Sequence, residues 1–213
     1  MEQVPEQVVY DTHSFKLPII LGSSSKFRAT ILRQHNVDFT VLKPDLDEKA
    51  VPGRDEHDPS ATALAIAHAK AAALASQIPA GTPPSLVITT DQVVGFAGTV
   101  REKPESADEC RHYIKSYEEA PAETHSAVVV TNTKTGKRVA GVDVARQYFA
   151  SVPNEVVDEL IRKGDVMHSC GGFVVDDPLL HPYLLAREGD EDSIIGMPMK
   201  LLMQLLKEAE EEM

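Results

Sequence analysis

Short apolar runs rich in β-branched residues recur along the chain, and their composition and length predict strands. The strongest run, 86–94, is apolar on both faces and predicts the buried centre of an α/β sheet. The runs 125–131 and 137–150 flank the turn 132–136 and predict a β-hairpin. The remaining predicted strands are 16–21, 37–42 and, at an edge of the sheet, 181–186.

Longer segments with helical spacing of their apolar residues lie between these strands. Asp58 as N-cap and Pro59 at the first helical position begin a helix that extends to residue 77. Its apolar stripe includes Ala67 and Ala71, and Lys70 lies beside them. Further helices are predicted after Ser24 or Ser25, over 105–117, over 153–163 and after 196–198. Strands that alternate with helices in this way indicate an α/β fold.

A single carboxylate, Asp91, stands within the apolar run 86–94, and Lys103 follows after a turn that contains glycine. A buried carboxylate without a partner costs several kcal/mol of folding free energy. We therefore expect Asp91 at the end of its strand, opening on a cleft where a metal ion or a base can pair with it. An aspartate that caps a loop or pairs with a structural lysine is the alternative interpretation.

The first strand leads through Gly22 and a run of serines into a helix. This arrangement points backbone N–H groups and the positive end of a helix dipole at an anion. The loop is neither a Walker A motif nor GxGxxG, so the signal is weak by itself and a plain helix cap is the ordinary interpretation. Arg28 in the first helical turn opposes the dipole, which either an anionic ligand or a partner such as Asp45 or Asp47 would explain.

Three further features bear on a site. Acids crowd the loop 43–49, where the ordinary interpretation is a solvated loop but Glu48 or Asp47 could reach a metal ion. Lys70 can extend to water or reach into a cleft, and the sequence favours neither. The segment 170–173, Cys-Gly-Gly-Phe, predicts a close passage of the backbone past another element.

Composition limits the function classes. The 213 residues are 42% hydrophobic and 25% charged, which predicts a soluble globular domain over 16–213 with an acidic C-terminal end, after an N-terminal tail over 1–15. No apolar run approaches the roughly 20 residues of a membrane span. The 2 cysteines form neither a disulfide framework nor a CxxC site, which indicates a reducing, cytoplasmic location. The net charge of −12 argues against nucleic-acid binding, so an anionic ligand would need locally gathered bases and a divalent cation.

Together the motifs of the chain resemble the Maf family, often called septum-formation inhibitors, which are nucleoside triphosphate pyrophosphatases. The resemblance runs over 16–207 and rests on LGSSSKFR, PDLDE, AHAKAAALA, TTDQVV, EKP, THSAVVV, CGGF and EGDEDSIIGMP, in the family's order. It implies a mixed, twisted α/β sheet flanked by helices, with two lobes around a deep nucleotide-binding cleft, usually as a homodimer. The implied reaction is attack of water on the α-phosphate, with Mg²⁺ or Mn²⁺, giving a nucleoside monophosphate and pyrophosphate.

The resemblance also assigns roles to residues of this chain. Ser23 and Arg28 stand where the family binds phosphates in its first loop, and Glu48 stands at its metal-associated acid. The phosphate-facing lysines fall on Lys70 and Lys103, and the catalytic aspartate falls on Asp91. Asp91 would either bind the metal or take the proton from the attacking water, and both roles remain open.

Substrate preference depends on another set of positions. Family members that act on dTTP and UTP usually have a basic residue where Phe27 stands, Thr where Gln92 stands and Gln where Asp176 stands. Members that act on 7-methylguanosine triphosphate have an aromatic residue, Gln and an acid, as here. An aromatic face stacks on a cationic methylated purine, and a carboxylate accepts from guanine N–H groups. The alternative for Phe27 is a plain core residue of its helix. The segment 115–124 departs from the family pattern, lacking its usual Ser-Gly pair.

The sequence therefore predicts a house-cleaning enzyme of nucleotide metabolism that removes a modified, 7-methylguanosine-type triphosphate. A dTTP/UTP pyrophosphatase is the nearer alternative. A catalytically idle, nucleotide-binding regulator of cell division is the more distant one.

Overall fold

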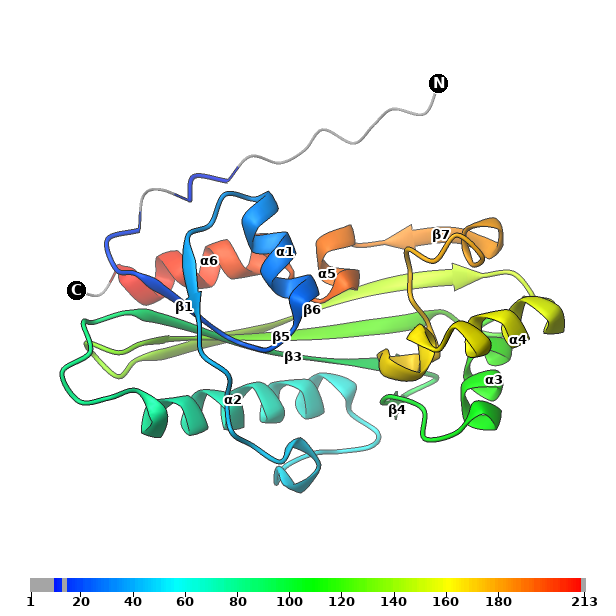
Figure 1. The fold of residues 1–213 in the computed structure, drawn as a ribbon, viewed down its shortest axis with the longest axis horizontal. Coiled ribbons are helices and arrows are strands. Elements are labelled where there is room, and N and C mark those ends of the chain that lie inside the picture. The colour runs from blue at the N-terminus through cyan, green and yellow to red at the C-terminus, as the bar shows by residue number, and fades with distance from the viewer. Residues whose placement is uncertain (1–9, 13–14, 212–213) are drawn as a thin grey trace.

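A computed structural model describes residues 10–12 and 15–211, which form a seven-stranded mixed sheet in the order β2-β1-β3-β5-β6-β7, with β4 paired to β3 (Figure 1). β1 runs parallel to β2 and β3, and the other pairings are antiparallel. The strands are β1 Ile19–Gly22, β2 Phe39–Val41, β3 Leu86–Phe96, β4 Thr99–Arg101, β5 Ala122–Asn132, β6 Arg138–Phe149 and β7 Leu184–Glu188.

Helices cover both faces of the sheet. In Figure 1, α2 lies below the strands, α1, α5 and α6 lie above them, and α3 and α4 pack at one end. The helices are α1 Lys26–Gln34, α2 Pro59–Gln77, α3 Ala107–Ser116, α4 Asn154–Lys163, α5 Glu191–Ile195 and α6 Met199–Glu210, with single 3-10 turns η1 Glu48–Ala50, η2 Asp165–His168, η3 Cys170–Gly172 and η4 His181–Tyr183. The mixed α/β sheet flanked by helices that the sequence predicts is therefore confirmed.

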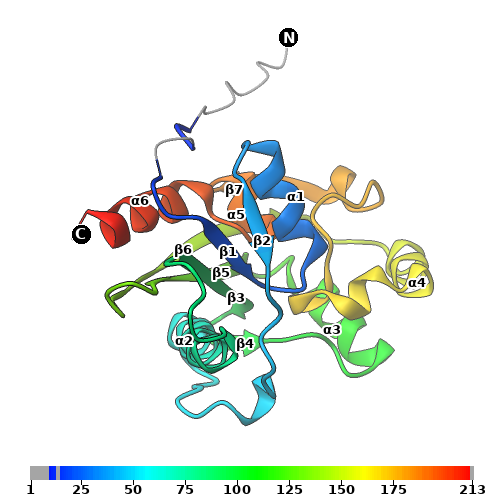
Figure 2. The ribbon, with the colours of Figure 1, turned by 60° about the vertical axis from the view of Figure 1, so that its left-hand side comes forward.

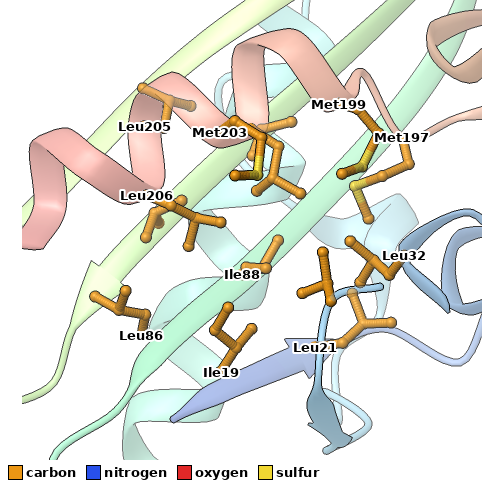
Figure 3. Close-up of a cluster of buried hydrophobic side chains, with 14 of the residues drawn as sticks. Ile19, Leu21, Leu32, Leu86, Ile88, Met197, Met199, Met203, Leu205 and Leu206 are labelled. Atoms are coloured by element: carbon orange, nitrogen blue, oxygen red, sulfur yellow. The ribbon is translucent and has the colours of Figure 1, made fainter. Parts of the chain in front are cut away.

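The largest hydrophobic cluster lies between the sheet and the helices α1 and α6 (Figure 3). Leu21, Ile88 and Leu206 are fully buried there. On the opposite face, the alanines of α2 pack against β3 and β5. Their small side chains allow the helix backbone to approach the sheet closely. A further cluster joins α3 and α4 to the beginning of β5 and the end of β6.

Local sequence signals explain where the elements begin and end. The side chain of Ser25 caps α1 and that of Asp58 caps α2. Gly164 ends α4 in the left-handed conformation with φ of 89°. None of the described helices is long and apolar enough to cross a membrane.

Part of the predicted N-terminal tail lies outside the described residues. Among the residues that are described, the Tyr10 ring packs edge-on against His35, and Thr12 Oγ1 donates to the Asn36 carbonyl over 2.8 Å. At the other end of the chain, Glu210 accepts the backbone N–H groups of Lys16 and Leu17. The first strand is thus fastened to the acidic end of α6.

Candidate active site

A gap in the strand pairing defines the centre of the site. β1 pairs with residues 86–89 of β3, and β4 pairs with residues 94–96 on the same edge. Asp91 and Gln92 lie between these pairings, while β5 continues along the other edge of β3. The prediction that Asp91 ends its strand is wrong, because β3 continues to Phe96 and turns into β4. Instead, it is the neighbouring strand β1 that stops short.

Side chains take the place of the missing strand. The Thr90 carbonyl accepts from Lys70 Nζ at 3.3 Å and from Arg28 Nη1 at 3.4 Å. The Gln92 carbonyl accepts from Cys170 Sγ at 3.3 Å. Burial raises the pKa of Cys170 to about 11, and the negative charge of Asp91 contributes to this shift. The thiol therefore keeps its proton near neutral pH. Buried backbone carbonyls need such partners, and the site supplies them.

Lys70 joins the two candidate acids. Its Nζ lies 2.7 Å from Asp91 Oδ1 and 2.8 Å from Glu48 Oε1. Lys70 is 5% exposed, so it reaches into the interior rather than to water. Burial raises the pKa of Asp91 although Lys70 and Arg28 oppose the shift. Burial also acts to raise the pKa of Glu48, but Lys70, Lys103 and Arg28 outweigh it and lower that pKa.

Arg28 is held by neutral oxygens. Within the described residues, its guanidinium donates to Ser23 Oγ at 3.3 Å, to the Gly196 carbonyl at 3.1 Å and to the Thr90 carbonyl. Neither Asp45 nor Asp47 is its partner. Burial lowers the pKa of Arg28 while Asp91 opposes the shift. An arginine remains protonated in a protein, so it presents a positive charge to any ligand beside it.

One pocket of about 1290 Å³ brings the predicted site residues together. Ligand sites usually span about 300–1,000 Å³, so this pocket has ample room for a nucleoside triphosphate. Its lining includes Ser23, Phe27, Arg28, Glu48, Lys70, Asp91, Gln92, Lys103 and Asp176. Residues separated by most of the chain thus converge on one cavity. The division of the molecule into two lobes stays a prediction.

The candidate base-recognition residues Phe27 and Asp176 are exposed members of the pocket lining. Phe27 is 66% exposed in the first turn of α1, so the alternative that it is a core residue is wrong. Asp176 is exposed in the loop between η3 and η4. An exposed aromatic ring in a pocket lining is available to stack on a ligand.

Gln92 is turned toward the protein. Its Nε2 lies 2.8 Å from Ser126 Oγ, 3.0 Å from the Ser193 carbonyl and 3.1 Å from the Ile194 carbonyl. The amide nitrogen thereby connects β3 to β5 and α5. Sequence reasoning missed this role, although Ser126 and Ser193 fall within the motifs THSAVVV and EGDEDSIIGMP.

The glycines of the segment 170–173 allow the close passage that the sequence predicts. Gly171 has φ of 70°, and a Cβ there would lie 2.7 Å from Tyr117 Oη and 2.8 Å from Val94 Cβ. The Tyr117 hydroxyl donates to the Gly171 carbonyl over 2.7 Å. Tyr117 belongs to the segment 115–124 that departs from the family pattern, so this segment supports the wall of the pocket beside Cys170.

The carboxylates of the pocket suit a hard divalent cation that is also bound by the phosphates of a substrate. The described residues contain no group of three or more His, Cys, Asp or Glu side chains that could hold a metal ion. Glu48 and Asp91 nevertheless converge on one point, the Lys70 ammonium. Mg²⁺ is commonly bound through one or two carboxylates together with substrate phosphates and water. These two carboxylates fit that mode of binding.

Comparisons with known proteins identify the family of the chain. The family described as "Maf-like protein" matches residues 18–209. A "7-methyl-GTP pyrophosphatase" of Dictyostelium discoideum is 42% identical over 195 residues, covering 90% of this chain and 96% of that protein. A protein of the same name from Burkholderia lata is 32% identical, covering 90% of each chain. A "dTTP/UTP pyrophosphatase" of Chlamydia caviae is 27% identical, covering 89% of this chain and 93% of that protein. With a family match over nearly its whole length, the chain belongs to the Maf family.

Proposed function

We propose that the chain is a nucleoside triphosphate pyrophosphatase that hydrolyses a 7-methylguanosine-type triphosphate to the monophosphate and pyrophosphate. The oxygen of water attacks the α-phosphorus, and the bond from that phosphorus to the bridging oxygen of the β-phosphate breaks. The observation that carries this proposal is the cluster of Lys70, Asp91 and Glu48 beside Arg28 in one large pocket. The Dictyostelium relative, named "7-methyl-GTP pyrophosphatase", supports the substrate.

Asp91 takes the proton from the attacking water in this proposal. Burial raises its pKa, which makes its carboxylate a better proton acceptor than an ordinary aspartate. The Lys70 ammonium, 2.7 Å away, keeps the carboxylate ionised despite burial and fixes its orientation. Proton transfer from water to Asp91 then leaves a hydroxide oxygen to form the new bond.

The cations of the pocket hold the triphosphate. Arg28 and Lys103 both line the pocket and supply local positive charge in a chain of net charge −12. Phosphoryl transfer depends mainly on positioning and charge neutralisation. Each charge-assisted contact of this kind is worth roughly 1.5–3 kcal/mol.

Glu48 is the residue that would hold Mg²⁺ or Mn²⁺ in the proposal, together with phosphate oxygens of the substrate, since Asp91 acts as the base. When bound, the cation neutralises charge on the phosphates. In that role Glu48 benefits from its lowered pKa, because it stays ionised.

Phe27 and Asp176 select the base in the proposal. A 7-methylated guanine carries a positive charge, and the exposed Phe27 ring can stack on it. Asp176 accepts hydrogen bonds from the base N–H groups. Plain GTP lacks the cationic ring, so it can still stack on Phe27 but loses the cation–π contribution.

The test measures pyrophosphate release from 7-methylguanosine triphosphate, GTP, dTTP and UTP, each with Mg²⁺ and with Mn²⁺. We expect pyrophosphate and the monophosphate, with the methylated nucleotide preferred in kcat/KM. If dTTP or UTP is preferred by more than about tenfold, a difference of roughly 1.4 kcal/mol, the substrate assignment fails. Release of phosphate and a diphosphate would contradict the cleavage point, and no release from any triphosphate would leave a nucleotide-binding protein without activity.

The family resemblance further leads us to propose a homodimer located in the cytoplasm. Light scattering coupled to gel filtration measures the first, and a mass of one chain would contradict it.

A further inference from the structure

Two segments far apart in the sequence face each other along one wall of the pocket. The chain between β2 and α2 passes β4 (Figure 2), where the Val100 N–H donates to the Glu56 carbonyl over 2.8 Å. Arg54 Nη2 lies 2.6 Å from Glu102 Oε2. Lys49 Nζ lies 2.8 Å from Glu105 Oε1. The contacts follow in antiparallel order, so the segments 48–56 and 100–105 are joined at successive points.

Arg54 is the contact that reaches the candidate site residues. Besides its ion pair with Glu102, its Nη1 donates to the backbone carbonyl of Glu48 over 3.0 Å. Glu48 is the acid that binds Lys70, and Glu102 directly precedes Lys103. One guanidinium therefore touches the segment of the candidate metal acid and the segment of a candidate phosphate lysine.

The ion pair of Arg54 with Glu102 is more buried than that of Lys49 with Glu105. The side chains of Arg54 and Glu102 are 22% and 39% exposed, whereas those of Lys49 and Glu105 are 76% and 77% exposed. A solvent-exposed pair contributes little, about 0–1 kcal/mol. Both pairs line the pocket, so they differ in burial and in the second contact that Arg54 makes to Glu48.

We propose that Arg54 is a positioning residue of this site: it holds the Glu48 turn against the segment that carries Lys103, and so sets the place of Glu48 relative to Asp91. The inference rests on the proposed function. An arginine suits the role because its planar fork can donate to a carbonyl and a carboxylate at once. A lysine has a single ammonium on a flexible stem and cannot reproduce both contacts with the same geometry.

The experiment compares Arg54→Met, Arg54→Lys and, as a matched control on the same loop, Lys49→Met. Three quantities are measured: the dissociation constant of Mn²⁺ alone, from the electron paramagnetic resonance signal of the free ion; hydrogen exchange of peptides covering 48–56; and the Mn²⁺ dependence of pyrophosphate release. The amides of Ala50 and Val51 report on the Glu48 turn, since they bond to Asp47 and Glu48 carbonyls.

Arg54→Met should weaken Mn²⁺ binding about tenfold or more, as loss of groups behind metal ligands does. It should also accelerate exchange over 48–56 and raise the Mn²⁺ concentration for half-maximal activity. Arg54→Lys should fall between this variant and the wild type. Lys49→Met should change each quantity by less than about twofold, as expected for an exposed pair.

Unchanged Mn²⁺ binding and exchange in Arg54→Met would overturn the inference, and so would an equally large effect of Lys49→Met. If Arg54→Met does not fold, Glu102→Gln is the substitute, because it removes the ion pair and leaves Arg54 bonded to Glu48. Unaltered hydrogen exchange over 48–56 in Glu102→Gln would also refute the inference. If the wild type releases no pyrophosphate from any triphosphate, the proposed function fails, while Mn²⁺ binding and exchange still decide the role of Arg54.

Discussion

Lys70 Nζ lies 2.7 Å from Asp91 Oδ1, and both side chains are less than a tenth exposed. The ionisation of Asp91 is therefore opposed by burial and favoured by the neighbouring ammonium of Lys70. Burial raises the pKa of Asp91, and Lys70 is the strongest of the charges that act against this shift. The pair can be tested through its titration as well as through its activity.

The pH dependence of kcat/KM should move when Lys70 is replaced. Asp91 must be ionised to accept a proton, so activity should fall at acid pH through its pKa, above the ordinary aspartate value of about 3.9. Lys70→Met removes a charge that lowers this pKa, so the acid limb should shift to higher pH. Lys103→Met is the control, because the charges acting on Asp91 are those of Lys70, Arg28 and Glu48. An acid limb that stays in place in Lys70→Met would refute the coupling.

Asp91→Asn should abolish most of the activity and keep the fold. We expect kcat to fall by about 10²–10⁴-fold, the usual contribution of a general base. Because the folded-state pKa of Asp91 is raised, its ionised form opposes folding once the pH rises through that pKa. Asparagine removes this cost and keeps an oxygen for Lys70, so the melting temperature at pH 7 should equal or exceed that of the wild type. Near-normal turnover, or a large drop in melting temperature, would contradict these roles.

Phe27→Ala should reduce the discrimination between 7-methylguanosine triphosphate and GTP. An exposed cation–π contact is worth about 0.5–1 kcal/mol, and more when desolvated, so the ratio of kcat/KM values should fall by roughly threefold or more. Leu185→Ala is the matched control, since Leu185 is 69% exposed on β7 and is not part of the pocket lining. Equal discrimination in Phe27→Ala and the wild type would exclude a cation–π contribution of Phe27 to base selection.

Gly171→Ala should destabilise the wall of the pocket. Gly171 and Gly136 both have positive φ, of 70° and 76°, but a Cβ at Gly136 would meet nothing within 4 Å. Gly136→Ala should therefore cost only the backbone strain, about 1–2 kcal/mol. Gly171→Ala adds contacts with Tyr117 and Val94 and should cost about 1–3 kcal/mol more. Urea unfolding with matched slopes measures both, and equal losses would contradict the close packing at Gly171.

Most elements of the fold could be predicted because their signals are local. Asp58 and Pro59 begin α2 where predicted, and the hairpin of β5 and β6 turns within 132–136 as predicted. β4 was missed because its hairpin turns through Ala97 and Gly98, with φ of 49° and 77°. The sequence indicated a turn with glycine here, but an alanine before that glycine is not a recognised hairpin signal, and only the three residues Thr99–Arg101 pair as the return strand. Asp91 was predicted at a strand end because a buried carboxylate without a partner is costly, and the sequence did not show that the buried Lys70 pairs with it.

The candidate site was predicted better than its supporting contacts. The motifs indicated Arg28 and Lys70, and the structure places them together. The contact of Gln92 with Ser126 depends on strand register, and that of Arg54 with Glu102 depends on two loops meeting. No spacing along the chain encodes either relationship, because each is created by tertiary packing.

The short β1 strand affects how members of such a family can lose activity during evolution. Arg28 and Lys70 bond the Thr90 carbonyl that no strand reaches, so selection for folding alone would retain them. A descendant that no longer turns over nucleotides could keep both residues. Lys103, which is exposed, is free of that constraint and would be among the first to drift. Substitution at Lys103 is therefore an informative sign that a relative is inactive. Retention of Arg28 and Lys70 says less about whether a relative is active.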